Sequence, residues 1–409
     1  MDKLYIMLSN GIVGMGGGQM YTKNKAVYMK SLGYDVQIYS GHQGIVLIKD
    51  LMEYQKYIDP IFLSSPLVYK KSTVNRITQG VKDKASNYKE IIIESGIAHM
   101  ALWGEIFAKE LNCKHMVHLL DERNDLLVPE SYLDFYWFKH SRRELSGITA
   151  NSLKMLFRNN VNINDSNSYW LPSYCQNVVS EEQSGQYEEF PIADYNLCTI
   201  GRLDKPYVLE AAKAYVRLAN KRKDICWNFI FIGGADENKT AEIKSAFEGI
   251  ENAHAVMLGY VYPIPNSLLN RMDLFISSAG SAGVSYSADK RTITIDSVDL
   301  KAIGVLGYTT FKRLNRDDEP KIEIDELIEK VLFTDYLTHF SYKENIKVDG
   351  EKLLRQHIDF MEASTQKKEY YPVWNLQSQG KEKVKKIIAT IIGDKLYIKL
   401  NSKRACNAG

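Results

Sequence analysis

The stretch Leu197–Gly234, LCTIGRLDKPYVLEAAKAYVRLANKRKDICWNFIFIGG, decides the fold of this chain. A short apolar run at its start ends in a turn that contains glycine and proline. Apolar residues at helical spacing follow, and a second apolar run, Trp227–Ile232, ends in two glycines. Strand, turn, helix and strand in this order predict a βαβ unit, the building block of a parallel sheet.

The turn inside this unit has the composition of an anion site. It carries Arg202 and Lys205, and Pro206 suits the first turn of the helix that follows. Backbone N–H groups at a helix N-terminus and cationic side chains both favour a bound anion. We therefore predict that the turn holds the diphosphate of an activated sugar. From these residues alone, a solvated Arg and Lys on an ordinary surface turn is the alternative.

The composition is ordinary for a globular protein. The chain has 409 residues, which suggests two or three domains, with 45% hydrophobic and 25% charged residues. A net charge of +2 gives no reason to expect a nucleic-acid partner. The five cysteines are scattered and form no C-x-x-C pair, which argues against a disulfide framework or a zinc site and fits a reducing compartment.

The cellular location follows from the same inspection. The N-terminus leads directly into an apolar strand without the layout of a signal peptide. No apolar run approaches the about 20 residues that cross a bilayer. We expect a cytoplasmic protein, with a peripheral place on the inner membrane face left open.

A second glycine-rich turn follows the first expected strand, Leu4–Ser9. It has five glycines in the eight positions 11–18, before a helix at 20–32 and a strand at 35–39. The dinucleotide spacing G-x-G-x-x-G fails because Gln19 and Tyr21 occupy the third glycine position, so NAD binding is disfavoured. Three of these glycines, Gly16, Gly17 and Gly18, are expected to let the backbone approach a ligand closely. The alternative is a flexible loop that binds no ligand.

Polar side chains follow the next two buried strands, expected at 90–94 and 114–120. His99 comes after the first strand, and Asp121 and Glu122 come directly after the second. Ligands in open α/β sheets bind outside the carboxyl ends of the strands. The two carboxylates are therefore candidates for a general base, and the alternative is that they cap the following helix. His99 is a candidate for ligand binding, and the alternative is a structural role.

A basic stretch at 70–89 contains Val74, Ile77 and Val81 at helical spacing. A basic amphipathic helix can lie on an anionic membrane surface. A solvated helix face is the more common meaning of such a pattern, so both interpretations stay open.

Two α/β domains are expected. We place an N-terminal Rossmann-like domain at 1–178, a polar linker at 179–192 and a C-terminal Rossmann-like domain at 193–370. A helix at 371–394 would return to the N-terminal domain, and a loose basic tail would occupy 395–409. Within the second domain, a loop of small residues after the strand at 273–277 predicts backbone donors for a phosphate or sugar.

The chain resembles the nucleotide-sugar glycosyltransferases of the retaining family 4 type, found in bacterial capsule and surface-polysaccharide clusters. The resemblance rests on three motifs in order: GMGGGQMYTKNKAVYMKSLGYDVQIYS at Gly14–Ser40, CTIGRLDKP at Cys198–Pro206 and AVMLGYVYPIPNSLLNRMDLFISS at Ala255–Ser278. It implies a GT-B fold, in which two Rossmann-like domains face a cleft and C-terminal helices return to the first domain.

The resemblance also implies an activity of the hexosyltransferase type. A sugar would pass from a nucleotide-diphosphate sugar to a saccharide or lipid-linked saccharide acceptor with retention, without a metal or another cofactor. Arg202 and Lys205 would grip the diphosphate. The strand-end glycines and the Gly-aromatic turn would bind donor, at Gly201, Gly233, Gly259 and Tyr260.

One departure from the family pattern concerns the second domain. The usual E-x(7)-E is replaced by AGSAGVSYSADK at Ala279–Lys290, which contains no glutamate. Contacts to the sugar and ribose would then come from Ser281, Gly283, Asp296 or Thr309. An inactive relative that binds a sugar or a partner is the alternative function.

Overall fold

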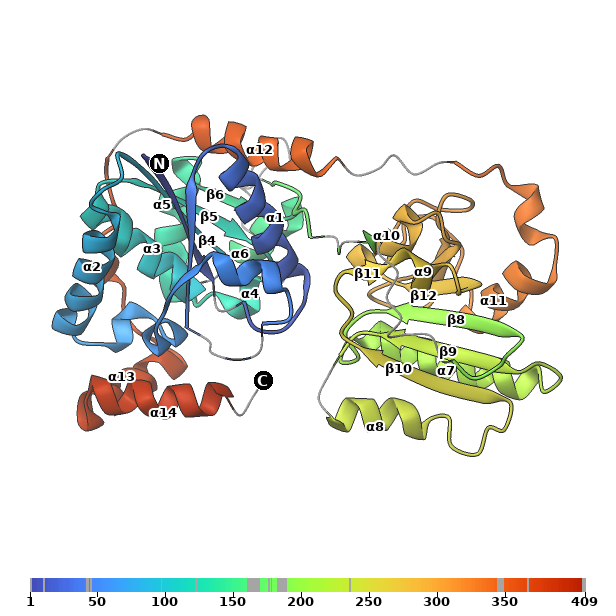
Figure 1. Cartoon of the computed structure of the whole chain (residues 1–409). Coiled ribbons are helices and arrows are strands. Elements are labelled where there is room, and N and C mark those ends of the chain that lie inside the picture. Colours follow the sequence, from blue (N-terminus) through green and yellow to red (C-terminus); the bar gives the residue numbers. More distant parts are fainter. Residues whose placement is uncertain are drawn as a thin grey trace. The chain divides into compact units, whose positions relative to one another are not determined.

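The structure is a computed structural model that describes residues 2–9, 12–41, 44, 46–96, 98–121, 124–159, 170–175, 177, 179–181, 190–234, 237–343, 349–365 and 368–406. The chain divides into two compact units. Unit 1 combines 1–175 with 349–409, and unit 2 is 176–348. Each unit is an α/β structure built on a mostly parallel sheet, as the sequence predicts (Figure 1).

In unit 1 the described residues form a six-stranded parallel sheet in the order β3-β2-β1-β4-β5-β6. Its strands are β1 (Lys3–Ser9), β2 (Asp35–Ser40), β3 (Gln55–Ile58), β4 (Glu90–Ser95), β5 (Lys114–Leu119) and β6 (Leu145–Gly147). The helices are α1 (Gly17–Ser31), α2 (Lys71–Ala85), α3 (Ala98–Leu111), α4 (Asn124–Leu127), α5 (Leu133–Ser141), α6 (Ala150–Leu156), α12 (Gly350–Glu362), α13 (Gly380–Ile392) and α14 (Asp394–Cys406).

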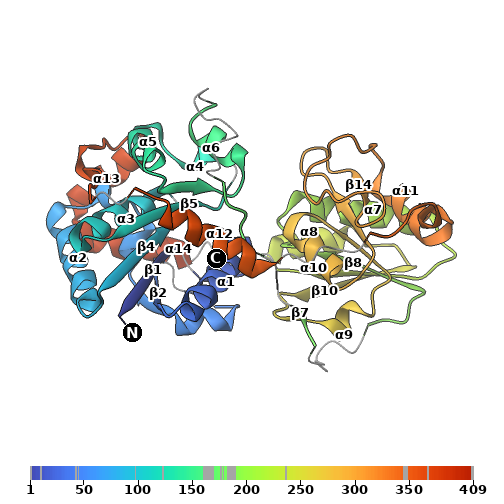
Figure 2. The ribbon, with the colours of Figure 1, turned by 90° about the horizontal axis from the view of Figure 1, so that it is seen from above.

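Alternation along β1 separates two layers of unit 1. Leu4, Ile6 and Leu8 point into an apolar core that α2, α3 and α14 cover. Tyr5 points to the other face, where its hydroxyl donates to Glu94. Glu94 also accepts a hydrogen bond from Tyr21 of α1, and Tyr21 contacts His357 of α12. Buried strands of this kind need cover on both faces, because a parallel sheet has no solvated side. The helix α12 lies beside α1 in both views (Figures 1 and 2).

Unit 2 repeats the same strand order, β10-β9-β8-β12-β13-β14, with β14 antiparallel to β13. The strands of its main sheet are β8 (Tyr195–Ile200), β9 (Trp227–Ile232), β10 (Ala253–Gly259), β12 (Leu274–Ser277), β13 (Thr292–Ile295) and β14 (Ala302–Val305), and a small pair is formed by β7 (Val179–Ser180) and β11 (Ile264–Pro265). The helices are α7 (Pro206–Lys221), α8 (Glu237–Ser245), α9 (Asn266–Leu269), α10 (Ala279–Ser287) and α11 (Ile324–Phe333).

The βαβ unit predicted from the opening stretch is β8-α7-β9. The two strands are adjacent and parallel, with Leu197 paired to Phe229. Apolar residues of α7 are buried against the sheet because they recur at helical spacing, as Val208, Ala211, Tyr215 and Leu218 do.

Three segments differ from the sequence-based expectation. The small-residue loop after β12 is a helix, α10, because it contains no proline and its Ala282, Val284 and Tyr286 pack inward. The segment 395–406 of the expected tail belongs to the helix α14, which Tyr397 anchors to the core of unit 1. The return to unit 1 begins at 349, before the expected 371, since His357 on α12 contacts Tyr21.

Candidate functional site

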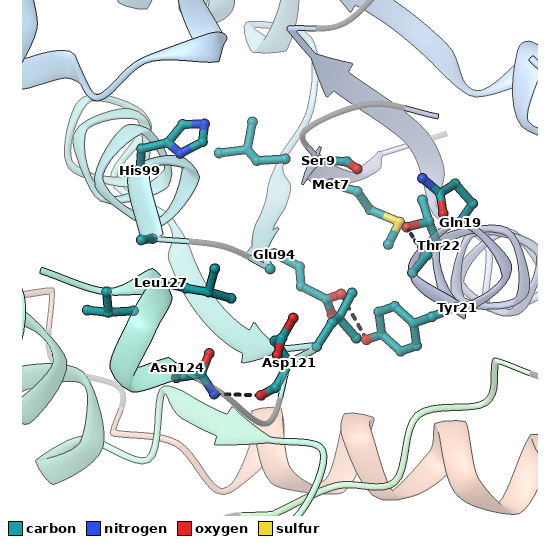
Figure 3. A pocket seen from close by; sticks show the side chains of 16 residues that line it. Met7, Ser9, Gln19, Tyr21, Thr22, Glu94, His99, Asp121, Asn124 and Leu127 are labelled. Atoms are coloured by element: carbon teal, nitrogen blue, oxygen red, sulfur yellow. Dashed lines mark hydrogen bonds between the residues drawn. The ribbon is translucent and has the colours of Figure 1, made fainter. Parts of the chain in front are cut away.

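Unit 1 has a cavity of about 470 Å³ where β1, β4 and β5 end (Figure 3). The strand order reverses between β1 and β4, since β2 continues from β1 on one side and β4 on the other. Open α/β sheets bind ligands at such a switch point. The volume lies within the range of small-molecule sites. The polar residues at the cavity include Ser9, Gln19, Tyr21, Thr22, Glu94, His99, Asp121 and Asn124.

Glu94 forms the polar floor of this cavity. It is 6% exposed and its carboxylate accepts hydrogen bonds from the Tyr5 hydroxyl at 2.5 Å and from the Tyr21 hydroxyl at 2.9 Å. The Lys25 ammonium lies 3.7 Å from the same carboxylate. Burial lowers the pKa of Lys25, and the charge of Glu94 opposes that shift. Burial and the Glu94 charge both raise the pKa of Tyr5 and Tyr21.

Two neutral histidines extend this network below the cavity. The Tyr21 hydroxyl lies 3.4 Å from Nδ1 of His357, whose Nε2 lies 3.1 Å from the Pro172 carbonyl oxygen. The ring of His118 contacts both side chains. Burial and then the charge of Lys25 lower the pKa of His118 to about 3, and they lower the pKa of His357 as well.

Only some of the residues predicted for the site in unit 1 line the cavity. Gly18, His99 and Asp121 line the cavity, and the Asp121 side chain is exposed. His99 lies apart from Glu94 and Tyr21 (Figure 3). The predicted base Glu122 lies outside the described residues.

Two predicted glycines do not line the cavity. Gly16 is the N-cap of α1, with an extended backbone that any residue adopts, and Gly17 is the first residue of that helix. A Cβ at Gly17 would meet Cys175 at an ordinary 3.7 Å. The glycines at these two positions therefore start a helix, and the close ligand approach expected of them stays a prediction.

In unit 2 the structure brings the predicted strand-end glycines together. The Gly233 N–H donates to the Gly259 carbonyl at 2.8 Å, and a Cβ on Gly233 would lie 1.9 Å from the Gly201 carbonyl oxygen. A Cβ on Gly234 would strike the Tyr260 ring at 2.1 Å. The ends of β8, β9 and β10 can approach this closely only because these positions carry no side chain.

Arg202 extends from this cluster of strand ends. Its charge acts on two tyrosines, Tyr207 and Tyr260. Burial raises the pKa of both phenols, and the positive charge of Arg202 opposes that rise. The guanidinium is exposed and lies 3.2 Å from the Asp204 carboxylate. Lys205 is exposed and is the N-cap of α7, with Pro206 in the first turn. Two cations thus stand at the helix N-terminus, as the sequence predicts. One of them, Arg202, forms an ion pair with Asp204.

The helix α10 contributes a side chain to this edge of the sheet. Ser281 lies in its first turn and acts to lower the pKa of Tyr207, whose hydroxyl donates to the Ile200 carbonyl at 3.1 Å. Gly283 is buried in the helix, where the backbone N–H groups serve the helix itself. This geometry keeps Ser281 as a candidate and argues against the predicted contact of Gly283.

The last two predicted residues hold turns. The Asp296 carboxylate accepts the backbone N–H groups of Val298, Asp299 and Arg316 at 2.7–3.1 Å. Burial raises the pKa of Asp296, but these three N–H groups outweigh it and lower the pKa. The Thr309 hydroxyl accepts the Val305 N–H at 2.8 Å. Their oxygens accept hydrogen bonds from backbone donors, and the expected sugar contacts of both residues stay predictions.

Sequence reasoning missed Tyr21 and Glu94. A signal for Glu94 exists, because it is an acidic residue inside the buried strand Glu90–Ser95. No periodicity marks Tyr21, whose partner is 73 positions away.

The basic helix expected at 70–89 is α2. Its apolar residues Val74, Ile77 and Val81 are buried in the core of unit 1, so its exposed face is polar. Within the described ranges, no helix has the length and apolar character of a bilayer-spanning segment. The same residues contain no group of three or more His, Cys, Asp or Glu side chains that could hold a metal ion.

No protein-family model and no curated protein matches this sequence. Solved structures do match. A glycosyltransferase from Rickettsia africae has a TM-score of 0.55 at 14% identity, over 88% of this chain and 96% of its own. The sucrose-phosphate synthase of Thermosynechococcus elongatus has a TM-score of 0.53 at 10% identity, over 88% and 96%. Anabaena HepE, solved with UDP-glucose, has a TM-score of 0.50 at 11% identity, over 88% and 97%. These likenesses show the fold, a GT-B type with two Rossmann-like domains.

Proposed function

We propose that this chain is a glycosyltransferase that moves a hexosyl unit from a nucleotide-diphosphate sugar to a hydroxyl acceptor with retention. We place it in the synthesis of a surface polysaccharide, with a saccharide or lipid-linked saccharide as acceptor. The fold it shares with a glycosyltransferase and with a protein solved with UDP-glucose is consistent with this proposal.

One observation carries the proposal. Arg202 and Lys205 stand at the N-terminus of α7, directly after β8, beside strand ends that glycines allow to pack closely. A helix N-terminus with two cations favours a diphosphate. The neighbouring Tyr260 offers a ring face for a nucleotide base.

The chemistry follows from that placement. The bond between the anomeric carbon and the diphosphate oxygen breaks, and the diphosphate leaves with the electron pair. The acceptor oxygen bonds to the same carbon and gives up its proton. Arg202 and Lys205 offset the charge that builds on the leaving group. A general base for that proton, predicted from the sequence at Asp121 and Glu122, stays a prediction.

The test is ligand-dependent thermal stabilisation. We expect UDP-, GDP- or ADP-glucose to raise the Tm of the wild type, because a ligand that binds only the folded state stabilises it. Arg202→Ala and Lys205→Ala should each abolish the shift. In a transfer assay, each should lower kcat about a hundredfold or more.

Arg222 provides a matched control. It pairs with Asp224 at 3.0 Å, the same two-residue spacing as Arg202 and Asp204, but at the far end of α7. Arg222→Ala should keep the full ligand shift. An unchanged shift in both Arg202→Ala and Lys205→Ala would remove the diphosphate assignment.

A second candidate is an inactive protein that binds a sugar nucleotide. It is favoured by the sequence of α10, which contains no glutamate after β12. Stabilisation by the donor without transfer or hydrolysis, across a panel of saccharide acceptors, would support this candidate against the enzyme.

A further inference from the structure

The C-terminal hairpin, defined as α13 and α14, exposes an apolar ridge on unit 1. Figure 1 shows these two helices in red at the edge of the unit. They pack against each other and against the turns at Pro60–Leu63 and Pro66–Val68. The ridge consists of exposed aliphatic side chains, from 42% at Ile388 to 77% at Ile391: Val384, Ile387, Ile388 and Ile391 on α13, and Leu396 and Leu400 on α14.

The ridge points away from the body of unit 1. The four α13 residues span an arc of about 100° at 3.6 residues per turn. Ala389 is fully buried on the opposite side of that helix. On α14 Tyr397 is buried, and its hydroxyl lies 3.4 Å from that of Ser64. Both helices are therefore attached by one face and carry aliphatic side chains on another.

The acidic and basic side chains of the hairpin lie on different sides. Its two acidic residues turn inward: Glu382 accepts a hydrogen bond from Tyr132, and Asp394 accepts the Lys70 N–H and the Thr73 hydroxyl at the start of α2. The outward surface is left with cations that flank the ridge, the exposed Lys381, Lys383, Lys385, Lys395 and Lys399.

We propose that the C-terminal hairpin docks unit 1 onto an anionic phospholipid bilayer. An interfacial helix buries an aliphatic face at the level of the headgroups while lysines on its rims meet lipid phosphates. The hairpin has both features. The helix α2 has only the cations, because its own apolar face is in the core.

Charge also argues against a second copy of this chain as the occupant. Joining two ridges would bring two lysine rims together, with both acidic residues of each hairpin turned inward. A bilayer that carries negative headgroups offers the complementary charge. The inference rests on the hairpin alone and stands independently of the proposed enzymatic activity.

The experiment uses the full chain and two vesicle preparations, phosphatidylcholine mixed with phosphatidylglycerol and phosphatidylcholine alone. Wild type should co-sediment with the anionic vesicles and lose binding as salt rises. Ile387→Glu with Ile391→Glu should weaken binding roughly tenfold or more. Lys383→Gln with Lys385→Gln should weaken it about 25-fold, at about fivefold per lysine.

Two controls isolate the hairpin. Met52→Glu changes another exposed aliphatic residue of unit 1, and Lys82→Gln changes an exposed cation of α2. Both should bind like wild type, and circular dichroism with thermal melting checks that every variant is folded.

Three results would overturn the proposal. The first is a wild type that stays in the supernatant with anionic vesicles. The second is equal binding of the Ile387→Glu/Ile391→Glu variant and wild type. The third is a vesicle-free dimer in light scattering that this variant converts to a monomer, since the ridge would then be a self-association surface.

Discussion

Glu94 shows how one side chain can set the chemistry of a whole cavity. It reaches three partners from two elements, Tyr5 on β1 and Tyr21 and Lys25 on α1. A buried charge without partners costs several kcal/mol, so these contacts are needed for the carboxylate to stay at that place. The same contacts leave the carboxylate facing the cavity, where it can accept a hydrogen bond from a ligand hydroxyl.

We predict that Glu94→Gln lowers the free energy of unfolding by about 3–5 kcal/mol, because Lys25 stays buried without its counter-charge. Urea denaturation followed by circular dichroism measures it. The double variant Lys25→Met/Glu94→Gln should recover part of the loss, since it removes the unpaired cation. A loss below about 1 kcal/mol in the single variant would contradict the role of this ion pair.

In unit 2, the turns that follow β8 and β9 depend on each other for their shape. The turn after β9 enters the space beside the turn after β8, and Gly233 has a φ of 154°. A side chain at Gly233 would meet backbone at 1.9 Å, which no rotamer change can relieve. The turn that carries Arg202 therefore keeps its shape only while Gly201 and Gly233 are both present.

Gly233→Ala should destabilise unit 2 by more than about 3 kcal/mol, beyond the range of backbone strain alone. Gly249→Ala is the matched control: Gly249 also has a positive φ, 79°, but nothing lies within 4 Å of its added Cβ. Its cost should be near 1 kcal/mol. Thermal melting of the two variants compares them, and equal losses would show that the collision at Gly233 is relieved by movement of the turn.

At the scale of the whole molecule, the two units differ in how the chain builds them. Unit 2 is one continuous segment, whereas unit 1 needs 349–409 to complete it. Those residues enter two apolar clusters of unit 1, with Ala389 and Tyr397 in one and Val373 and Leu376 in the other.

We expect the fragment 176–348 to fold alone and to melt cooperatively, because its core is formed within the fragment. The fragment 1–175 should not, since it exposes the surfaces that 349–409 cover. Circular dichroism melting and size-exclusion chromatography of both fragments measure this, and co-expression of 349–409 should rescue 1–175. Cooperative melting of 1–175 alone would show that the C-terminal segment is an addition to a complete core.

The sequence by itself determined the α/β class, the βαβ unit at Leu197–Gly234 and the cations of its turn. Periodicity and turn residues act over a few positions, so they are readable without the fold. Only the tertiary structure decided which residues meet: the Glu94 network joins segments 69 or more positions apart, and Gly233 meets Gly201 across two strands. It also decided that 349–409 completes unit 1, and that Asp296 and Thr309 serve backbone donors. The physical reason is that burial and hydrogen-bond partners are properties of spatial neighbours, which local patterns do not encode.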